Sequence, residues 1–396
     1  MSLFLGKIFR AKIGAMLKIL IKAFIWFVLH VFYMLPINEH RIYFSSFLGR
    51  QFSCNPKYLY FYLLAHNSRN YSFVWEFDDV SKASLVPDAV VVKAKSLKAI
   101  MLCMTSKYLV FNAELPWYIP LRKNQVYLQT WHGGGAYKKL GLEANWGWRS
   151  NLEQKLCSKQ ISYYVSSCQK LTEVLSVSKF VPVEKFLSTG QPRDAFLLTA
   201  GEDKKAEIRQ KLGFDSSCQI VLYAPSYRGK PGFDKKEEDG YEKLDYNKLQ
   251  ASLSQKFGGS WKVLYRKHYY MASGVSEKDS DIIDVSRYDD MQELLLVADV
   301  LITDFSSSMW DFSLMYKPCF LYAPDIDAYD IERGFYTSPY SWPFPMARSN
   351  QELFNNILVF DDRKYKADVN RHFNDLGSYE NKDASEKIWK VVGVNI

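Results

Sequence analysis

Short strand-like runs alternate with helix-like runs along most of this sequence, and this alternation constrains the fold more than any other feature. Each strand-like run is apolar, and the stretch after it has apolar residues at helical spacing. Such alternation is typical of parallel sheets with helices on both faces. The first series of expected strands comprises Arg41–Ser45, Tyr71–Glu76, Ala89–Val92, Tyr108–Asn112, Val126–Thr130, Ile161–Ser166 and Phe186–Thr189.

A second series begins at Gln219, after an amphipathic, charged stretch, Glu202–Leu212, that we expect to form a helix crossing between domains. A length of 396 residues fits about two ordinary domains. We therefore expect an α/β fold with two Rossmann-like, doubly wound domains facing a cleft. The expected units are a membrane-associating segment (1–36), an acceptor-side domain (37–198), a donor-binding domain (199–380) and a C-terminal helix (381–396).

The amino-terminal segment combines basic and apolar side chains. Its lysines and arginine interleave with Phe, Ile and Leu, and the apolar run Ala23–Leu35 follows. A helix that spans a bilayer needs about 20 apolar residues, more than this run supplies. No small-residue cleavage site of a signal peptide follows it. We expect an amphipathic helix that lies in the headgroup region of an anionic membrane; the alternative is a helix packed on the protein's own core.

The stretch Val300–Tyr316 reads as a strand, a tight turn and the start of a helix. The turn holds Thr303-Asp304 and three serines, Ser306 to Ser308. Serine side chains cap helices, and the unpaired N–H groups of a helix start can hold phosphate. Taken alone, this stretch is equally compatible with an ordinary capped helix.

Three further polar segments follow expected strands: His132 with Gly133–Gly135, Ser226–Arg228 and Arg266–His268. Doubly wound sheets bind ligands at the carboxyl ends of their strands. A glycine run there lets the backbone approach a ligand or a neighbouring chain segment closely. Each segment alone also occurs as a plain turn or solvated surface. Together they supply cations, hydroxyls and imidazoles, which is the set that phosphate chemistry requires.

Several functional classes are disfavoured. The sequence has no GxxxxGK[ST] loop of ATPases and no GxSxG motif of lipase-type esterases. Six scattered cysteines without a CxxC pair, and histidines without ligand spacing, predict neither a metal site nor a disulfide framework, and fit a reducing compartment. The net charge of +8 favours anionic partners. Because the basic residues concentrate near the apolar amino terminus, we expect a lipid surface and no nucleic acid.

From about Arg41 to about Tyr336 the chain resembles the CDP-glycerol glycerophosphotransferases of Gram-positive teichoic acid synthesis. Several motifs carry the resemblance, in the order that the family has them. They are Phe44-Ser45-Ser46 with Gly49, Asn55-Pro56-Lys57, Gln129-Thr130-Trp131-His132-Gly133, Lys138-Lys139-Leu140-Gly141, Gly190-Gln191-Pro192-Arg193-Asp194, Tyr223-Ala224-Pro225 with Arg228, Lys267-His268, Ile302-Thr303-Asp304-Phe305-Ser306-Ser307 with Asp311-Phe312, and Arg333-Gly334-Phe335-Tyr336.

The resemblance implies a GT-B-like (glycosyltransferase-B-like) fold and a reaction. The enzyme would transfer a polyol phosphate from a CDP-polyol to a hydroxyl of a membrane-bound acceptor and release CMP. The expected donor is CDP-glycerol, and CDP-ribitol is the alternative. The acceptor would be an undecaprenyl-diphosphate-linked saccharide or a growing polymer. The enzyme would work as a peripheral protein at the cytoplasmic face of the cell membrane. No cofactor is required, and a divalent cation bridging the diphosphate is compatible with the chemistry.

The resemblance also implies residue roles. His132 would be the base in the first domain, and His268 would contact the donor diphosphate from the second. A neutral imidazole suits proton abstraction near pH 7. The residues expected to hold the donor phosphates are Arg228, Lys267, Thr303, Ser306, Ser307 and Ser308. Other expected cleft residues are Gly133, Gly134, Arg193 and Arg333.

The chain departs from the family pattern at three places near the expected cleft, which leaves the polyol and the acceptor open. Gly134-Gly135-Ala136 replaces the usual Thr-Pro, Tyr269 replaces the usual Pro after His268, and residues 337–343 replace an acidic tail. The long amino-terminal region common in the polymerases is also missing. This favours addition of one or a few units, or a capsule transferase with a related donor.

Two other functions stay open. A sugar transferase of the same fold would grip a sugar ring with carboxylates such as Asp325, Asp327 and Asp330. A non-catalytic membrane scaffold is disfavoured because both His132 and His268 are retained.

Overall fold

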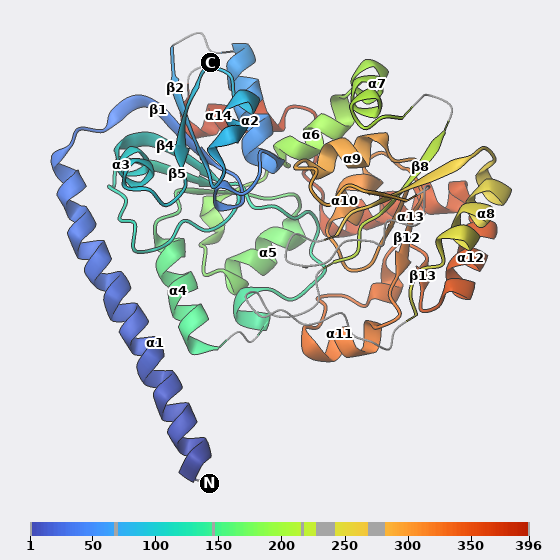
Figure 1. Ribbon diagram of the computed structural model, residues 1–396, viewed down its shortest axis with the longest axis horizontal. Coiled ribbons are helices and arrows are strands. Elements are labelled where there is room, and N and C mark those ends of the chain that lie inside the picture. The colour runs from blue at the N-terminus through green and yellow to red at the C-terminus, as the bar shows by residue number, and fades with distance from the viewer. Residues whose placement is uncertain are drawn as a thin grey trace.

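The computed structural model describes residues 2–66, 70–144, 147–214, 218–226, 242–267 and 282–394, with the backbone alone for residues 2–15. It contains two lobes, and each lobe is built on a sheet in which all pairs of strands are parallel (Figure 1). The expected pair of doubly wound α/β domains is therefore confirmed.

The first lobe holds the sheet with strand order β3-β2-β1-β4-β5-β6-β7. Its strands are β1 (Asn38–Ser45), β2 (Ser72–Phe77), β3 (Ala89–Lys93), β4 (Ser106–Phe111), β5 (Val126–Gln129), β6 (Tyr163–Val165) and β7 (Phe186–Leu187). Every strand predicted from the first series is present, with ends shifted by a few residues at most. The helices of this part are α2 (Cys54–His66), α3 (Leu97–Thr105), α4 (Trp148–Lys159), α5 (Gln169–Ser178) and α6 (Pro192–Thr199).

The second lobe holds the sheet with order β10-β9-β8-β11-β12-β13. Its strands are β8 (Gln219–Tyr223), β9 (Trp261–Tyr265), β10 (Ile282–Asp284), β11 (Val300–Thr303), β12 (Cys319–Tyr322) and β13 (Met346–Ala347). Its helices are α7 (Glu202–Lys211), α8 (Tyr246–Phe257), α9 (Met291–Val297), α10 (Ser308–Ser313), α11 (Ile326–Glu332), α12 (Asn350–Leu358) and α13 (Asp362–Leu376). The sequence pattern did not predict β13, α11 or α13.

Strand order reverses at one place in each sheet, and these two places position the site. In the first sheet β1 lies between β2 and β4, and in the second β8 lies between β9 and β11. Connections leave the sheet in opposite directions at such a reversal, so a crevice opens at the carboxyl ends of the two central strands. The polar segments that the sequence singled out follow β5, β8, β9 and β11.

The carboxyl-terminal helix, α14 (Ala384–Val392), returns to the first lobe, where it packs against α2 and α6. Trp389 is completely buried there, and its indole N–H donates to the carbonyl oxygen of Leu59 at 3.3 Å. The ring lies edge-on to Phe44, which stacks on Trp75 with 5.2 Å between the ring centroids. Burial of large aromatic rings contributes much of the stability of such a core.

The two lobes are also joined by buried charges. The Nζ of Lys57, on α2, lies 2.5 Å from Oδ2 of Asp290 and 2.6 Å from Oε1 of Glu293, both in the second lobe. The Lys57 side chain is only 9% exposed. A buried ion pair holds two elements in one relative placement because removing either partner leaves an unpaired charge away from water.

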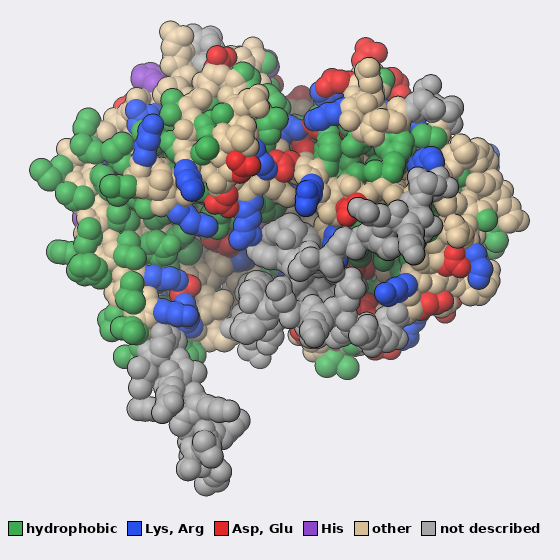
Figure 2. Space-filling view, viewed as in Figure 1, with side chains coloured by type: hydrophobic (Ala, Val, Ile, Leu, Met, Phe, Trp, Pro, Cys, Tyr) green, Lys and Arg blue, Asp and Glu red, His purple; other side chains and the backbone are tan. Residues whose placement is uncertain are grey.

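The amino-terminal helix, α1 (Ser2–Leu29), continues into the short 3-10 helix η1 (His30–Met34). Residues 16–34 form a stretch that is long and apolar enough to cross a membrane, by length and composition only. The sequence analysis had counted only Ala23–Leu35 as apolar, and the longer stretch accepts Lys18 and Lys22. Phe24 to Val28 are consecutive and exposed, and five consecutive residues point to all sides of a helix, so the exposed apolar side chains do not form one stripe. Figure 2 shows the visible face of the molecule, with hydrophobic side chains in green.

We predict that Trp389→Ala lowers the free energy of unfolding of the first lobe by about 3–5 kcal/mol, the cost of a large buried ring and the cavity it leaves. Val391→Ala on the same helix is the matched control, because Val391 is half exposed and surface changes cost within about 0.5 kcal/mol. Urea unfolding of both variants measures the difference. Equal stabilities would show that α14 does not complete this core.

Candidate active site

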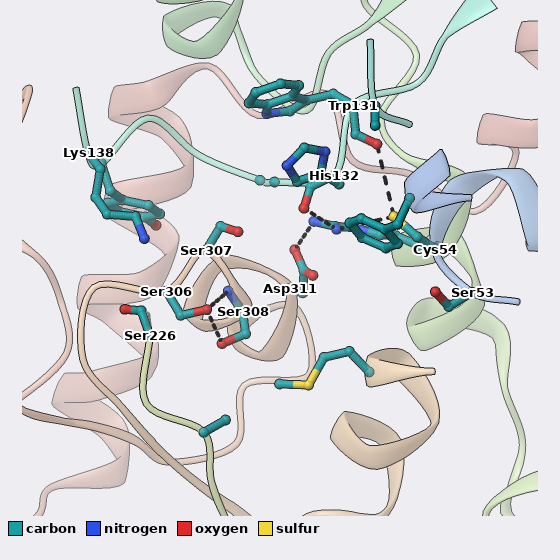
Figure 3. A pocket seen from close by; sticks show the side chains of 18 of the residues that line it. Ser53, Cys54, Trp131, His132, Lys138, Ser226, Ser306, Ser307, Ser308 and Asp311 are labelled. Carbon is teal, nitrogen blue, oxygen red and sulfur yellow. Dashed lines mark hydrogen bonds and ion pairs between the residues drawn. The ribbon is translucent and has the colours of Figure 1, made fainter. Parts of the chain in front are cut away.

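A cavity of about 620 Å³ lies between the lobes, lined by loops that follow strands of both sheets (Figure 3). Most of the predicted site residues line this one cavity. They are His132, Gly133, Gly134, Arg193, Lys267, Ser306, Ser307, Ser308 and Arg333. Arg228 and His268 lie outside the described residues, although Lys267, the residue before His268, lines the cavity.

Thr303 has a different place. It is completely buried, and its hydroxyl donates to the carbonyl oxygen of Ala224 at 2.7 Å. This contact joins the carboxyl ends of β11 and β8 beside the cavity, whose lining does not include Thr303. The structure therefore gives Thr303 a contact that fixes the sheet, in place of the predicted contact with phosphate.

His132 is held in one orientation and one tautomer. Its Nδ1 lies 2.6 Å from the carbonyl oxygen of Asn112, and because a carbonyl can only accept, Nδ1 carries the proton. Its Nε2 makes no hydrogen bond to any described residue, so this nitrogen keeps its lone pair. Burial lowers the pKa of His132 to about 4, although the Asn112 hydrogen bond and the nearby Glu114 act in the opposite direction. The imidazole is therefore neutral at pH 7 and able to accept a proton.

The backbone that carries His132 is strained and is held by amide side chains. Trp131 has φ +55°, a left-handed conformation that is unfavourable for a bulky residue. The Nδ2 of Asn55 donates to the carbonyl oxygens of Thr130 at 2.8 Å and Trp131 at 3.2 Å. Nε2 of Gln191 donates to the carbonyl oxygen of Gly133 at 2.8 Å. These bonds compensate for the strain and fix the loop.

The glycines after His132 allow the backbone of this loop to lie very close to the second lobe. A Cβ at Gly134 would lie 2.0 Å from Cδ1 of Trp310 on α10, which no side chain tolerates. A Cβ at Gly133 would lie 3.1 Å from Oγ of Ser307. The predicted close approach is confirmed, and here the neighbour is a segment of the other lobe.

One guanidinium connects the His132 loop to the second lobe. Arg193, in the first turn of α6, donates from Nη1 to the carbonyl oxygen of His132 at 2.7 Å. Its Nη2 donates to Oδ1 of Asp311 on α10 at 2.8 Å. The other oxygen of Asp311 accepts from Nε2 of Gln292 at 2.8 Å. Arg193, predicted only as a cleft residue, thus bridges the two lobes.

Two further carboxyl groups are buried beside this bridge. Burial raises the pKa of Asp194 well above its usual range and raises that of Glu380 to about 7. Neither carboxyl oxygen of Asp194 accepts a hydrogen bond from any described residue. A protonated Asp194 removes the repulsion among neighbouring carboxyl groups. Burial also raises the pKa of Asp311, while its ion pair with Arg193 acts in the opposite direction, and Asp311 is the main counter-ion of Arg193.

The three serines form the opposite side of the cavity. Oγ of Ser306 accepts from the backbone N–H of Ser308 at 3.3 Å and from its hydroxyl at 3.0 Å. The carboxylate of Asp304 accepts from the backbone N–H groups of Ser226, at 2.9 Å, and Phe305, at 2.5 Å, and so ties β8 to β11. Figure 3 shows Ser226 and the three serines close together below His132. The helix expected to run on toward Tyr316 ends at Ser313, so α10 is short.

Sequence reasoning missed several residues that build this site. Asn112 and Gln191 orient the His132 loop, Asp311 anchors Arg193, and Glu114 and Lys179 line the cavity. Asp311 and Gln191 stood within the quoted motifs, but their partners lie far away in the sequence. In the described part of the chain, no group of three or more His, Cys, Asp or Glu side chains is arranged to hold a metal ion.

Comparisons with known proteins agree with the motifs. Residues 27–393 match the family model for CDP-glycerol:poly(glycerophosphate) glycerophosphotransferase. A teichoic acid poly(glycerol phosphate) polymerase of Bacillus spizizenii is 30% identical over 91% of this chain and 94% of its own length. A teichoic acid glycerol-phosphate transferase of Staphylococcus aureus is 29% identical over 90% of this chain and 93% of its own. The chain spans 49% of a longer Bacillus subtilis polymerase of the same name as the first.

Comparison with solved structures indicates the same family. The wall teichoic acid polymerase TagF, in a structure with CDPG, has a TM-score of 0.80 and 28% identity, with 97% of each chain covered. The resemblance read from the motifs is confirmed, and so is the expected kind of enzyme, a glycerophosphotransferase. The chain therefore belongs to the CDP-glycerol:poly(glycerophosphate) glycerophosphotransferase family.

Proposed function

We propose that this protein transfers glycerol phosphate from CDP-glycerol to a hydroxyl of a lipid-linked acceptor during synthesis of teichoic acid or a related cell-surface polymer. Family membership supports the reaction. One observation supports the proposed residue roles most strongly: His132 is neutral and lines the cavity together with Ser306 to Ser308 and Lys267. A base on one side and phosphate-binding groups on the other are what attack of a hydroxyl on phosphorus requires.

In this mechanism Nε2 of His132 takes the proton of the acceptor hydroxyl as the hydroxyl oxygen bonds to phosphorus. The bond between that phosphorus and the bridging oxygen of CMP breaks, and CMP leaves with the electron pair. Hydroxyls of Ser306 to Ser308 and the ammonium of Lys267 hold the phosphate oxygens, where negative charge increases. Arg228, His268 and Arg333 keep their predicted roles as phosphate ligands and cleft residues.

The residues that line the cavity do not support the alternative function, a sugar transferase. Asp325, Asp327 and Asp330, the carboxylates it would use, are absent from the residues that line it. Asp327 instead pairs with Arg348 on the protein surface. CDP-ribitol remains the second donor to test, because a teichoic acid poly(ribitol-phosphate) polymerase of Bacillus spizizenii is 27% identical over 91% of this chain.

Incubation of the purified protein with single donors tests the proposed reaction. We expect release of CMP from CDP-glycerol in the presence of a lipid-linked acceptor, less from CDP-ribitol, and no UDP from UDP-sugars. Liquid chromatography of the nucleotide products measures this. Preferential release of UDP would refute the proposal, and preferential use of CDP-ribitol would change the polyol.

We predict that His132→Ala lowers kcat by roughly 10²-fold or more, because the acceptor hydroxyl loses its base. In the unaltered protein, kcat/KM should hold from neutral pH down to about pH 5 and fall toward pH 4, since the base is lost only as pH falls through the pKa of about 4. His66→Ala, an exposed histidine on α2, is the matched control. A near-normal rate in His132→Ala would refute the role of His132 as the base. A fall of kcat/KM centred near pH 6.5 in the unaltered protein would refute it as well.

We also propose that α1 attaches the protein to the cytoplasmic face of the membrane as a peripheral anchor. Its exposed apolar side chains support this, as does the ion pair of 2.8 Å between Lys22 and Glu153, which ties α1 to α4. An anchor beside the first lobe would keep the cavity close to a lipid-linked acceptor. Basic side chains near the apolar stretch favour anionic lipid.

We predict that Phe24→Glu combined with Phe27→Glu releases the protein from vesicles that contain phosphatidylglycerol. Both rings are more than two-thirds exposed, at 67% and 71%, so the folded state should tolerate the change. Vesicle sedimentation measures binding. Val359→Glu is the control, because Val359 is 76% exposed and follows α12 in the other lobe. Equal binding of the double variant and the control would refute the anchor.

A further inference from the structure

An ion pair lines the cavity on the first-lobe side of His132, and the mechanism above does not use it. Nζ of Lys179, at the end of α5, lies 2.6 Å from Oε1 of Glu114, which follows β4. The same ammonium lies 2.9 Å from Oε1 of Gln154 and 5.1 Å from the centre of the Trp131 ring. The Lys179 side chain is 5% exposed and that of Glu114 is 27% exposed. Lys179 is thus fixed, while part of the Glu114 side chain stays accessible.

This ion pair lies on the side of His132 away from the serines. Lys179 contacts the Trp131 ring, and that ring lies 4.4 Å from the His132 ring. Figure 3 shows Trp131 and the serines on opposite sides of His132. Phosphorus sits on the serine side in the proposed reaction, and the acceptor reaches His132 from the other. The rest of the acceptor therefore lies against Glu114 and Lys179.

The charges of Glu114 and Lys179 determine which kind of ligand group can bind beside them. Burial raises the pKa of Glu114, but the ion pair and hydrogen bond with Lys179, together with His132 and a backbone hydrogen bond, lower it further, so the net pKa lies below the usual value and the carboxylate stays charged. A charged carboxylate repels phosphate oxygens and accepts hydrogen bonds from hydroxyl groups. Hydrogen bonds to a charged group are stronger than neutral ones. The accessible carboxylate suits a hydroxyl that donates to it, and Lys179 holds that carboxylate in place.

We propose that Glu114 and Lys179 form an acceptor subsite that binds a hydroxyl adjacent to the attacking one, on a polyol or sugar terminus. This inference rests on the proposed function, since it places the acceptor by the role of His132. It predicts that the terminus of the acceptor is a diol, and that phosphate groups of the acceptor lie farther from His132. Loss of one hydrogen bond to a charged group lowers affinity by about 10-fold or more.

Two soluble probes of equal charge test the subsite with CDP-glycerol as donor. Octyl glycerol phosphate ends in a vicinal diol, and octyl 3-hydroxypropyl phosphate lacks the middle hydroxyl. The unaltered protein should release CMP with at least about 10-fold higher kcat/KM for the diol. Equal use of both probes overturns the subsite without any variant. Failure to release CMP from every donor, with both probes and with the lipid-linked acceptor, instead overturns the proposed function, and the subsite with it.

Glu114→Gln provides the second test, because it keeps the shape and removes the charge. We expect its KM for the diol probe to rise by about 10-fold or more, its preference for the diol to disappear, and CDP-glycerol binding without acceptor to stay unchanged in a calorimetric titration. Glu173→Gln is the matched control, since Glu173 lies on α5 and is 51% exposed. A Glu114→Gln enzyme with lower kcat but an unchanged KM for the diol would overturn the subsite.

Discussion

The guanidinium of Arg193 is the contact on which the geometry of this site depends. It donates to the carbonyl oxygen of His132 at 2.7 Å and to Asp311 at 2.8 Å, and so fastens the loop of the base to α10. α10 begins at Ser308, directly after the other two serines, so Asp311 lies one helical turn from the serines proposed to bind phosphate. The placement of His132 relative to these serines therefore depends on one planar side chain. Arginine suits this task because its donors point in fixed directions.

The environment of Arg193 explains why such a buried charge is tolerated. A guanidinium away from water is stable only with a counter-ion and well-placed acceptors. Asp311 supplies the charge, and the His132 carbonyl supplies a second acceptor. The raised pKa of Asp194 favours its neutral form, which limits the negative charge beside the bridge. The bridge further depends on contact between the lobes, which the Lys57 ion pairs and the Gly134–Trp310 approach maintain elsewhere in the interface.

Local patterns in the sequence were sufficient to predict the parallel sheets, and most of the site residues predicted from them line the cavity. Strand-like runs are local, and ligand sites at their carboxyl ends follow from topology. α13 was missed although its signal was present: Tyr365, Val369, Phe373 and Leu376 recur at helical spacing between the capping Asp361 and Gly377. The many charged residues of this stretch made its helical pattern of apolar residues hard to recognise. The two-residue strand β13 carries almost no pattern. The Arg193–Asp311 pair spans 118 positions, and a single sequence holds no signal for such a pairing.

In the proposed reaction, the two lobes divide the electrostatic work between them. On the serine side, hydroxyls and Lys267 face the oxygens that become more negative as CMP leaves. On the other side His132 becomes an imidazolium when it takes the proton, and the charged Glu114 raises its proton affinity against the effect of burial. Each charge that develops therefore appears next to a fixed charge or dipole of opposite sign. Because the base starts neutral, its Nε2 lone pair is available to accept the proton of an approaching hydroxyl. This arrangement requires both lobes, since each alone supplies groups for only one of the two charges.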